Sequence, residues 1–345
     1  MRSQLYPFKV LAAVQCIWIS ALLLALGACK GSEQEATPTI QSAREDLPSP
    51  IDPAALSEFK DAFEKDESHS VRFHLLSRNF YMRQRIGQIF IGCNLDGKNE
   101  RICLLDTGTA ASSVPEDPFT LTYDSAGKVY WYLKGAVTQV GHSIDLKMFL
   151  AAGAAFSNTR LMRLFPTYFP VNLASQGIDG VIGEDLLLES GLTLDFKNSR
   201  VEIGRIGDRD KLPNSFRLNL NQQVVMPVEL NGDAVEAVFD TGASFTAVNR
   251  KWIQAHSDQF EELEDAAERT FSGEINKTHV YRARMLKVGE VEFSSLYVIA
   301  LDFARMPWLD SKTVVILGYN VISKGNWKLD YPSLHWSFNA PSLRL

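Results

Sequence analysis

The chain of 345 residues is 46% hydrophobic and 22% charged, a composition typical of a globular protein and unlike that of disordered or fibrous chains. Its length exceeds that of an ordinary single domain and suits two, with enough residues to bury a sizeable core. The formal net charge of -6 lacks the basic excess that nucleic-acid binding requires, so we expect no nucleic-acid partner.

The segment 1–29 has the pattern of an export signal. Arg2 and Lys9 form a basic start, and the apolar run VLAAVQCIWISALLLALGA leads to Cys29. The ending LGAC resembles the bacterial lipobox, in which the cysteine receives lipid after cleavage. This resemblance implies a lipoprotein anchored through Cys29 in the cell envelope, facing the periplasm, with the outer membrane favoured over the inner. An uncleaved signal anchor is the alternative, because the apolar run is nearly long enough to span a bilayer.

Two short segments separate this signal from the body of the chain. Residues 30–51 are polar and contain prolines, so they predict a flexible tether. Residues 52–69 begin with an Asp-Pro pair, and Leu56, Phe59 and Phe63 fall on one face of a helix that we expect to pack on the protein body.

The cysteines fit an exported protein. Cys16 leaves with the signal and Cys29 takes the lipid, so the folded part keeps Cys93 and Cys103. They flank NLDGKNERI, in which Asp-Gly is a hairpin signal that places the two cysteines on adjacent strands. In an oxidising periplasm we expect them to form a disulfide bond. The alternative is two free, buried thiols that pack as small apolar side chains.

From about residue 70 the chain is rich in β-branched and aromatic residues and repeats itself. Asp106 in ICLLDTGTAASSV recurs as Asp240 in EAVFDTGASFTAV. At an offset only one position longer, Gly183 in GVIGEDLL recurs as Gly318 in VVILGYNVI, and LDFKNSRVEI recurs as LDYPSLHWSF. Since one register holds over such a span, we infer two copies of one β-rich unit.

The predicted units span residues 70–207 and 212–345, so the fold class is all-β with minor α content. Because both units lie in one chain, we expect a monomer. Asp195 and Asp330 also recur as a pair, each before a turn-like segment, and we expect them to cap hairpins.

Each unit supplies one Asp-Thr-Gly turn, and two such turns can do what one cannot. A lone exposed aspartate is ionised at neutral pH and is a poor catalyst. Two carboxyl groups held a few ångströms apart cannot both ionise, so they share a proton, and one acts as base while the other acts as acid. Asp106 and Asp240 are therefore the candidate catalytic pair.

The sequence resembles the aspartic peptidases of the pepsin and retropepsin type. The resemblance rests on DTGT at 106, DTGA at 240, VIG at 181–183 and ILG at 316–318, and it extends over both units. It implies duplicated acid-protease β-barrel lobes related by a pseudo-twofold axis. In that family the apolar-Gly segment passes under the aspartate loop and supports it.

The same resemblance implies an endopeptidase without a cofactor, acting on a peptide or protein substrate. Asp106 and Asp240 would hold the attacking water, and the two threonines that follow them would bond each loop to the opposite lobe. The adjacent glycines would let backbone amides approach the carboxylates. The supporting residues implied in this way are Thr107, Gly108, Thr109, Thr241, Gly242, Ala243, Gly183 and Gly318.

Two features are less regular. Thr109 carries a hydroxyl where Ala243 has none; a hydroxyl donating to Asp106 would favour its ionised form and leave the shared proton on Asp240. For the flap over the substrate, we favour VYWYLKGAV in the first unit and TFSGEI in the second. The alternative for these aromatic residues is ordinary sheet packing. The flap candidates are Tyr130, Trp131, Tyr132, Gly135 and Gly273.

Other functions remain to be weighed. The six histidines show no metal-ligand spacing, so we predict no metal site. A catalytically silent module that binds peptides or envelope partners would keep the fold, but it would be expected to lose an aspartate or glycine of the turns. A phosphotransferase is the third class, because DTGT is similar to the DKTGT motif of cation-pumping ATPases; that motif needs a lysine and Mg²⁺ and gives no reason for a second copy.

Overall fold

The computed structural model describes most of the chain beyond residue 86. The described residues are 21–23, 71–72, 74–75, 87–133, 136–152, 154–174, 177–207, 212–269, 275–306 and 308–340. Cys29, the predicted tether at 30–51 and the predicted helix at 52–69 lie outside them, as does most of the export signal. Among the described helices, none combines the length and hydropathy needed to cross a membrane.

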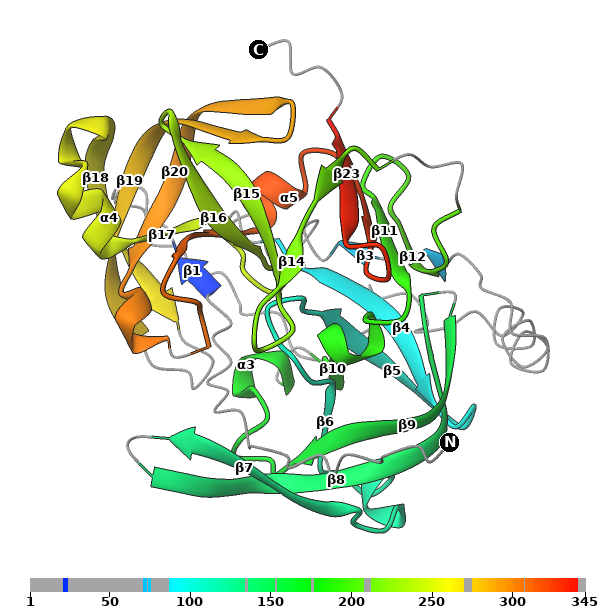
Figure 1. The fold of residues 1–345 in the computed structure, drawn as a ribbon. Helices are drawn as coiled ribbons and strands as arrows, with labels where there is room; N and C mark the ends of the chain where they lie inside the picture. Colours follow the sequence, from blue (N-terminus) through cyan, green and yellow to red (C-terminus); the bar gives the residue numbers. More distant parts are fainter. Residues whose placement is uncertain are drawn as a thin grey trace, which may run out of the picture.

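The first half of the chain forms a closed six-stranded barrel (Figure 1). Its strands are β4 (Ile89–Leu95), β5 (Asn99–Leu105), β6 (Ser113–Pro115), β8 (Ala136–Ala151), β9 (Ala154–Leu164) and β10 (Gly180–Ile182). They are bonded in the order β4-β5-β10-β6-β9-β8, and β8 pairs back with β4. Strand β7 (Gly127–Leu133) continues from β8 as a hairpin, and β3 (His74–Leu75) pairs with β4.

The second half forms a barrel on the same plan. Its strands are β15 (Val224–Leu230), β16 (Asp233–Phe239), β17 (Ala247–Asn249), β19 (Ile275–Val288), β20 (Val291–Leu301) and β21 (Thr313–Leu317). Their order is β15-β16-β21-β17-β20-β19, closed by β19 on β15. In both barrels the second strand runs parallel to the strand before the glycine: β5 with β10, and β16 with β21. The predicted all-β class and the duplicated barrels are therefore confirmed.

Further strands extend the second barrel. Strand β18 (Phe260–Arg269) pairs with β19, β1 (Ala21–Leu23) pairs with β18, and β14 (Arg217–Leu218) pairs with β15. The described helices are short. They are α3 (Val171–Ala174), α4 (Arg250–Ala255) and α5 (Tyr319–Ile322), with single 3₁₀ turns η1 (Thr120–Thr122), η2 (Glu184–Leu186), η3 (Ser257–Gln259) and η4 (Phe303–Arg305).

A third sheet joins the two halves of the chain. Its strands are β2 (Val71–Arg72), β11 (Gly191–Asp195), β12 (Arg200–Gly204), β13 (Asn214–Ser215), β22 (Asn326–Asp330) and β23 (His335–Asn339). The strand order is β13-β23-β22-β11-β12-β2. It is symmetric about its centre, because β22 is equivalent to β11, β23 to β12 and β13 to β2. The central pair is antiparallel β11–β22, with Leu192 opposite Leu329. This arrangement is the pseudo-twofold symmetry expected from the repeat.

Equivalent turns show how closely the copies agree. The β4–β5 and β15–β16 hairpins turn at Asp96 and Asn231, which have positive φ angles of 52° and 53° and precede a glycine. Each side chain accepts a backbone amide from its own barrel, Asp96 from Met148 at 2.8 Å and Asn231 from Met285 at 2.9 Å. Both residue types tolerate this backbone conformation and bond locally, which explains the tight turns of three residues in the first hairpin and two in the second.

The core is continuous across both barrels and the joining sheet. Trp327 on β22 is fully buried at its centre, with ring centroids of Phe239, Phe338 and Trp336 at 4.8, 4.1 and 5.6 Å. Phe239 is the residue before Asp240, so this aromatic cluster supports the strand that presents the second aspartate. Burial of such large rings is among the strongest stabilising contributions in a core.

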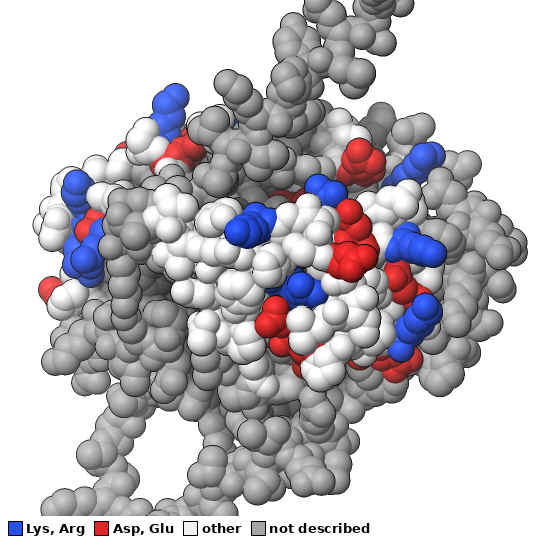
Figure 2. Space-filling view, turned by 90° about the horizontal axis from the view of Figure 1, so that it is seen from below, with Lys and Arg blue, Asp and Glu red and all other residues white. Residues whose placement is uncertain are grey.

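The predicted capping role of the repeated aspartates is confirmed. Asp195 accepts the backbone amide of Asn198 at 3.1 Å, and Asp330 accepts the hydroxyl of Ser333. On the surface, Figure 2 shows acidic and basic side chains interspersed over the described part of one face. An exposed pair on this kind of surface is Arg160 with Asp145 at 2.7 Å. Exposed pairs of this type contribute little to stability.

Candidate active site

The two aspartates leave equivalent strands and are held by the predicted apolar-Gly segments. Asp106 follows β5, and its amide donates to the Ile182 carbonyl on β10 at 2.9 Å. Asp240 follows β16, and its amide donates to the Leu317 carbonyl on β21 at 3.1 Å. Each aspartate is therefore fixed at its backbone by the strand that ends one residue before Gly183 or Gly318.

The threonines of the two turns bond across the symmetry axis. Thr107 Oγ1 donates to the Phe239 carbonyl at 2.9 Å and accepts the Thr241 amide at 3.0 Å. Thr241 Oγ1 donates to the Leu105 carbonyl at 2.7 Å and accepts the Thr107 amide at 3.1 Å. Both threonines are fully buried. Four hydrogen bonds thus join the two halves: two run from a turn to the strand of the other half, and two run between the turns.

The turn glycines allow the carboxyl groups to come close. The Gly108 amide donates to Asp106 Oδ1 at 2.9 Å, and the Gly242 amide donates to Asp240 Oδ1 at 2.8 Å. A Cβ on Gly108 would lie 2.5 Å from the carboxyl carbon of Asp240, and a Cβ on Gly242 would lie 2.4 Å from that of Asp106. No other residue type leaves room for the opposite aspartate.

The two carboxyl groups interact directly. Each lies against the turn glycine of the other half, and the charge of Asp240 acts on Asp106. Burial, followed by the charge of Asp240, raises the pKa of Asp106 well above its ordinary value. Burial raises the pKa of Asp240 to about 6, against stabilisation of its charged form by the Gly242 and Ala243 amides. The pair therefore keeps one proton over a range of pH in which isolated aspartates have lost theirs.

The expected asymmetry from Thr109 is wrong. Thr109 Oγ1 is buried and has no hydrogen-bond partner among the described residues, so it does not donate to Asp106. The shared proton favours Asp106 rather than Asp240, since Asp106 is 3% exposed whereas Asp240 remains partly accessible and accepts the Ala243 amide at 3.0 Å. The two carboxyl groups differ in pKa because they differ in burial, and not because of the extra hydroxyl.

Two glutamines that the sequence interpretation missed complete the cross-links. Gln88 Nε2 donates to the Gly242 carbonyl at 3.0 Å, and Gln223 Nε2 donates to the Gly108 carbonyl at 2.5 Å. Their exposed fractions are 5% and 2%. They occupy matching positions of the repeat, each directly before the first strand of its barrel. That shared offset was the available signal, but nothing in the sequence says which carbonyl each amide meets.

A second missed set lies under the turns. Ser112 Oγ accepts the Gly183 amide at 2.9 Å and donates to Asp185 Oδ1 at 2.6 Å. The second half repeats the arrangement with Thr246, whose Oγ1 accepts the Gly318 amide at 3.2 Å and donates to Asn320 Oδ1 at 2.8 Å. One half thus uses a carboxyl group where the other uses an amide.

The predicted disulfide bond is confirmed. Cys93 on β4 and Cys103 on β5 are bonded, with 6.1 Å between their Cα atoms. The strands pair in a register that places Cys103 opposite Ile91 and Cys93 opposite Arg101, so the bond crosses the hairpin diagonally. Cys103 lies three residues before Asp106, and the disulfide therefore braces the strand that presents the first carboxyl group.

The flap candidates divide into several groups. Tyr130, Trp131 and Tyr132 lie on β7, which forms a long hairpin with β8 at the lower edge of Figure 1. Trp131 is only 5% exposed and packs in a cluster with residues of the barrel, so ordinary sheet packing explains it. Tyr130 is 39% exposed. Gly135 and Gly273 lie outside the described residues, and a flap function for this hairpin stays a prediction.

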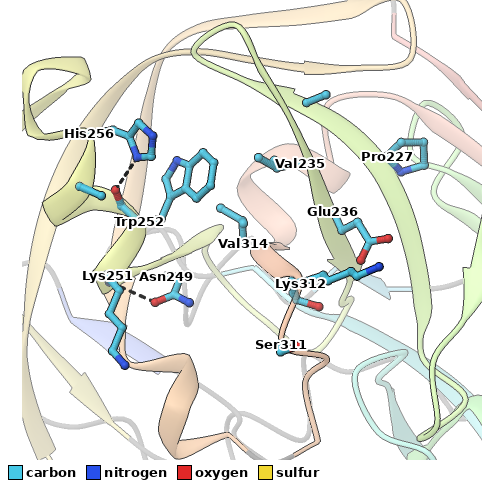
Figure 3. A pocket seen from close by; sticks show the side chains of 13 residues that line it. Pro227, Val235, Glu236, Asn249, Lys251, Trp252, His256, Ser311, Lys312 and Val314 are labelled. Carbon is cyan, nitrogen blue, oxygen red and sulfur yellow. Dashed lines mark hydrogen bonds between the residues drawn. The ribbon is translucent and has the colours of Figure 1, made fainter.

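A separate pocket of about 780 Å³ opens on the second barrel (Figure 3). Trp252 of α4 and His256, the residue after this helix, lie on one side of it and Glu236 of β16 on the other. Its lining includes neither Asp-Thr-Gly turn. Within the described residues, no group of three or more His, Cys, Asp or Glu side chains is placed to hold a metal ion.

Comparison with known proteins gives one family match. Residues 226–321 match the family model described as aspartyl protease. The matched segment runs from β15 to α5 and includes Asp240 and Gly318, but it does not include the first barrel. No curated protein matches the chain at a significant level. The second half of the chain is therefore similar to aspartyl proteases, and the first half is tied to it by the internal repeat.

Proposed function

We propose that the protein is an aspartic endopeptidase that hydrolyses peptide bonds through a water molecule activated by Asp106 and Asp240. The observation that carries this proposal is the close approach of two carboxyl groups, one buried and one partly accessible, each presented by an Asp-Thr-Gly turn of one barrel. The aspartyl protease match over residues 226–321 supports it for the second turn.

The protonation state of the pair suits this chemistry. In the resting enzyme Asp106 carries the shared proton and Asp240 is the carboxylate. Asp240 removes a proton from water as the water oxygen attacks the scissile carbonyl carbon, and Asp106 gives its proton to the carbonyl oxygen. The product is a neutral tetrahedral diol, with no covalent bond to the protein.

Collapse of this intermediate restores the pair. Asp106 takes a proton from one hydroxyl of the diol as the carbonyl re-forms, and Asp240 gives its proton to the leaving nitrogen as the C–N bond breaks. One water is consumed, an acid and an amine are released, and the carboxyl groups return to their starting states. No metal or cofactor takes part in this scheme.

Rigid placement of the pair is what the surrounding bonds contribute. Groups that are held in position before the reaction need no reorganisation when charge moves. The threonine bonds and the two glutamine bonds fix the turns relative to each other from both halves of the chain. These contacts support a catalytic role better than a silent binding role, since a binding module has no need to hold two carboxyl groups in contact.

We also propose that the protein is a monomer held in the cell envelope by a lipid on Cys29 and facing the periplasm, with the outer membrane favoured. The lipobox-like LGAC sequence motivates the anchor. The Cys93–Cys103 disulfide fits an oxidising compartment. Metabolic labelling with a radioactive fatty acid tests the anchor: label should enter the wild type and be absent from Cys29→Ala.

The activity itself is tested by incubating the detergent-solubilised full chain with a diverse peptide library at several acidic and neutral pH values. We expect cleavage that a hydroxyl-bearing transition-state mimic blocks and that chelators and serine reagents leave unchanged. Asp106→Asn, purified in the same way, is the matched control for contaminating peptidases. Peptide binding without cleavage at every pH would favour a silent binding module.

A further inference from the structure

Glu184 is a buried acid directly behind the first aspartate turn. It is the first residue of η2 and follows Gly183. Its amide donates to the Thr109 carbonyl at 2.9 Å, while the Ile182 carbonyl, two residues earlier, accepts the Asp106 amide. Glu184 is 0% exposed. Its backbone is therefore part of the same support that positions Asp106.

The carboxyl group of Glu184 lacks the partners that a buried charge needs. The Tyr331 hydroxyl and the Val224 amide are the polar groups that face it, but neither of its oxygens makes a hydrogen bond of normal geometry with a described residue. Tyr331, in the turn after β22, is 2% exposed, and its hydroxyl also has no such partner. The charged groups that act on Glu184 are the acids Asp106 and Asp185.

The internal repeat supplies a comparison for this position. In the register that matches Gly183 with Gly318, the residue equivalent to Glu184 is Tyr319, and the equivalent of Tyr331 is Phe196. Tyr319 and Phe196 pack edge to face with ring centroids 6.0 Å apart. One side of the pseudo-twofold axis thus has an aromatic pair where the other has Glu184 and Tyr331, so the fold itself does not require an acid here.

We infer that Glu184 is a third ionisable group of the active site that acts through Asp106, an inference that rests on the proposed function. It stays uncharged while the aspartate pair carries one negative charge. When it ionises at higher pH, the new charge opposes loss of the last proton from the pair. Glu184 thereby extends to higher pH the range in which the pair holds the proton that catalysis requires. It touches no substrate and is not itself a catalytic residue.

The physical basis is mutual repulsion in a buried region. Burial raises the pKa of Glu184 well above its usual 4.5, and the charges of Asp106 and Asp185 add to this effect. Two carboxyl groups that repel each other each hold a proton more strongly when the other is charged. The pKa of Tyr331 is also raised by burial and then by the Glu184 charge, so the phenol stays neutral throughout this range.

The test uses Glu184→Gln, which keeps the shape but cannot ionise, with Glu189→Gln as the control at an exposed position of the same segment. In the full-length protein, the basic limb of the kcat/KM profile should move to lower pH by about half a pH unit or more in Glu184→Gln. The acid limb should stay in place, because Glu184 is uncharged there. The profile of Glu189→Gln should match the wild type.

A second readout does not depend on activity. The wild type should lose stability relative to Glu184→Gln as the pH rises from 4.5, since the folded protein holds this proton more tightly than the unfolded chain. With both Asp106→Asn and Asp240→Asn present, the loss should still begin near pH 4.5 but should end at lower pH and be smaller in total, because no charge on the pair then opposes ionisation of Glu184 in the folded protein. The measurement is the free energy of urea unfolding at a series of pH values.

The possible outcomes separate the inference from the proposed function. A wild type that cleaves no peptide at any pH defeats the peptidase proposal, and the unfolding series still tests Glu184. If the free energy of unfolding changes with pH in the same way in the wild type and in Glu184→Gln, Glu184 contributes only packing. That result would overturn the inference. An unfolding difference that is unchanged in the double-asparagine background would show that Glu184 ionises without coupling to the pair, and would overturn it as well.

Discussion

Gln88 and Gln223 occupy positions related by the pseudo-twofold axis, and each donates a hydrogen bond to the turn of the other half. Their side-chain amides meet the carbonyls of Gly242 and Gly108 at 3.0 and 2.5 Å. Because each bond joins the two halves, the glutamines hold the two aspartate turns in position in addition to the hydrogen bonds of the threonines within the turns. The close approach of the carboxyl groups therefore depends on residues outside both Asp-Thr-Gly motifs.

Replacing either glutamine with leucine should lower both stability and activity. Each variant leaves a glycine carbonyl without its donor, which typically costs about 1–3 kcal/mol at a buried carbonyl such as that of Gly242 and less at the partly exposed Gly108. Urea unfolding and kcat/KM measure the two effects. Gln254→Leu, at an exposed position of α4, is the matched control. Unchanged activity in both Gln88→Leu and Gln223→Leu would show that this bracing is not needed.

The threonine network predicts a difference between two conservative replacements. Thr107→Val keeps the shape but removes the oxygen that donates to the Phe239 carbonyl and accepts the Thr241 amide. It should lose about 2 kcal/mol or more of stability, because two buried partners are left unpaired. Thr107→Ser keeps the oxygen and should stay close to the wild type. Equal unfolding midpoints for the two variants would contradict the network.

The disulfide should stabilise the first barrel. Its loss in the double variant Cys93→Ala/Cys103→Ala should cost about 2 kcal/mol, a modest value because the closed loop is short. Urea unfolding of this variant beside the wild type measures the effect. Thiol titration of the unfolded wild type, without reductant, should find neither cysteine free; two free thiols would contradict the pairing.

Stability should fall as pH rises through the range in which Asp185 titrates. Burial raises its pKa to about 6 from an ordinary 3.8, despite its bonds to Ser112. The folded protein thus binds this proton more tightly than the unfolded chain. The stabilisation that Asp185 contributes is therefore fully present below pH 3.8 and is lost as pH rises through about 6.

Asp185→Asn copies Asn320 and should remove this loss. At neutral pH the gain should be at most about 3 kcal/mol, and smaller to the extent that water reaches the partly accessible side chain. The check is the free energy of unfolding at acid and neutral pH. A variant less stable than the wild type at neutral pH would show that the carboxylate is favourable there, contrary to this account.

Much of the architecture was predictable because the repeat marks equivalent positions. Matching motifs at nearly constant spacing identified both aspartate turns, both apolar-Gly segments and the paired hairpin caps. The Asp-Gly turn indicated the hairpin that carries the disulfide. These features depend on local pattern and on one spacing, which a sequence carries directly.

The remaining features depend on packing between distant segments. The targets of Gln88 and Gln223 lie in the opposite half of the chain, so no local pattern reveals them. The prediction for Thr109 failed because the direction of a buried hydroxyl is set by the whole loop. Trp131 could not be assigned to the flap or to the core from sequence, because the sequence does not show which side of β7 faces the barrel.

The central claim is that Asp106 and Asp240 act as one catalytic unit, and the most direct test is kcat/KM for peptide hydrolysis in Asp106→Asn, Asp240→Asn and the double variant. Each single change keeps shape but removes the group that passes a proton, so each should lose several orders of magnitude. The double variant should be little worse than either, because residues that act as a unit are not additive. Wild-type kcat/KM in Asp240→Asn, with its fold shown intact by an unchanged unfolding curve at low pH, would contradict the account.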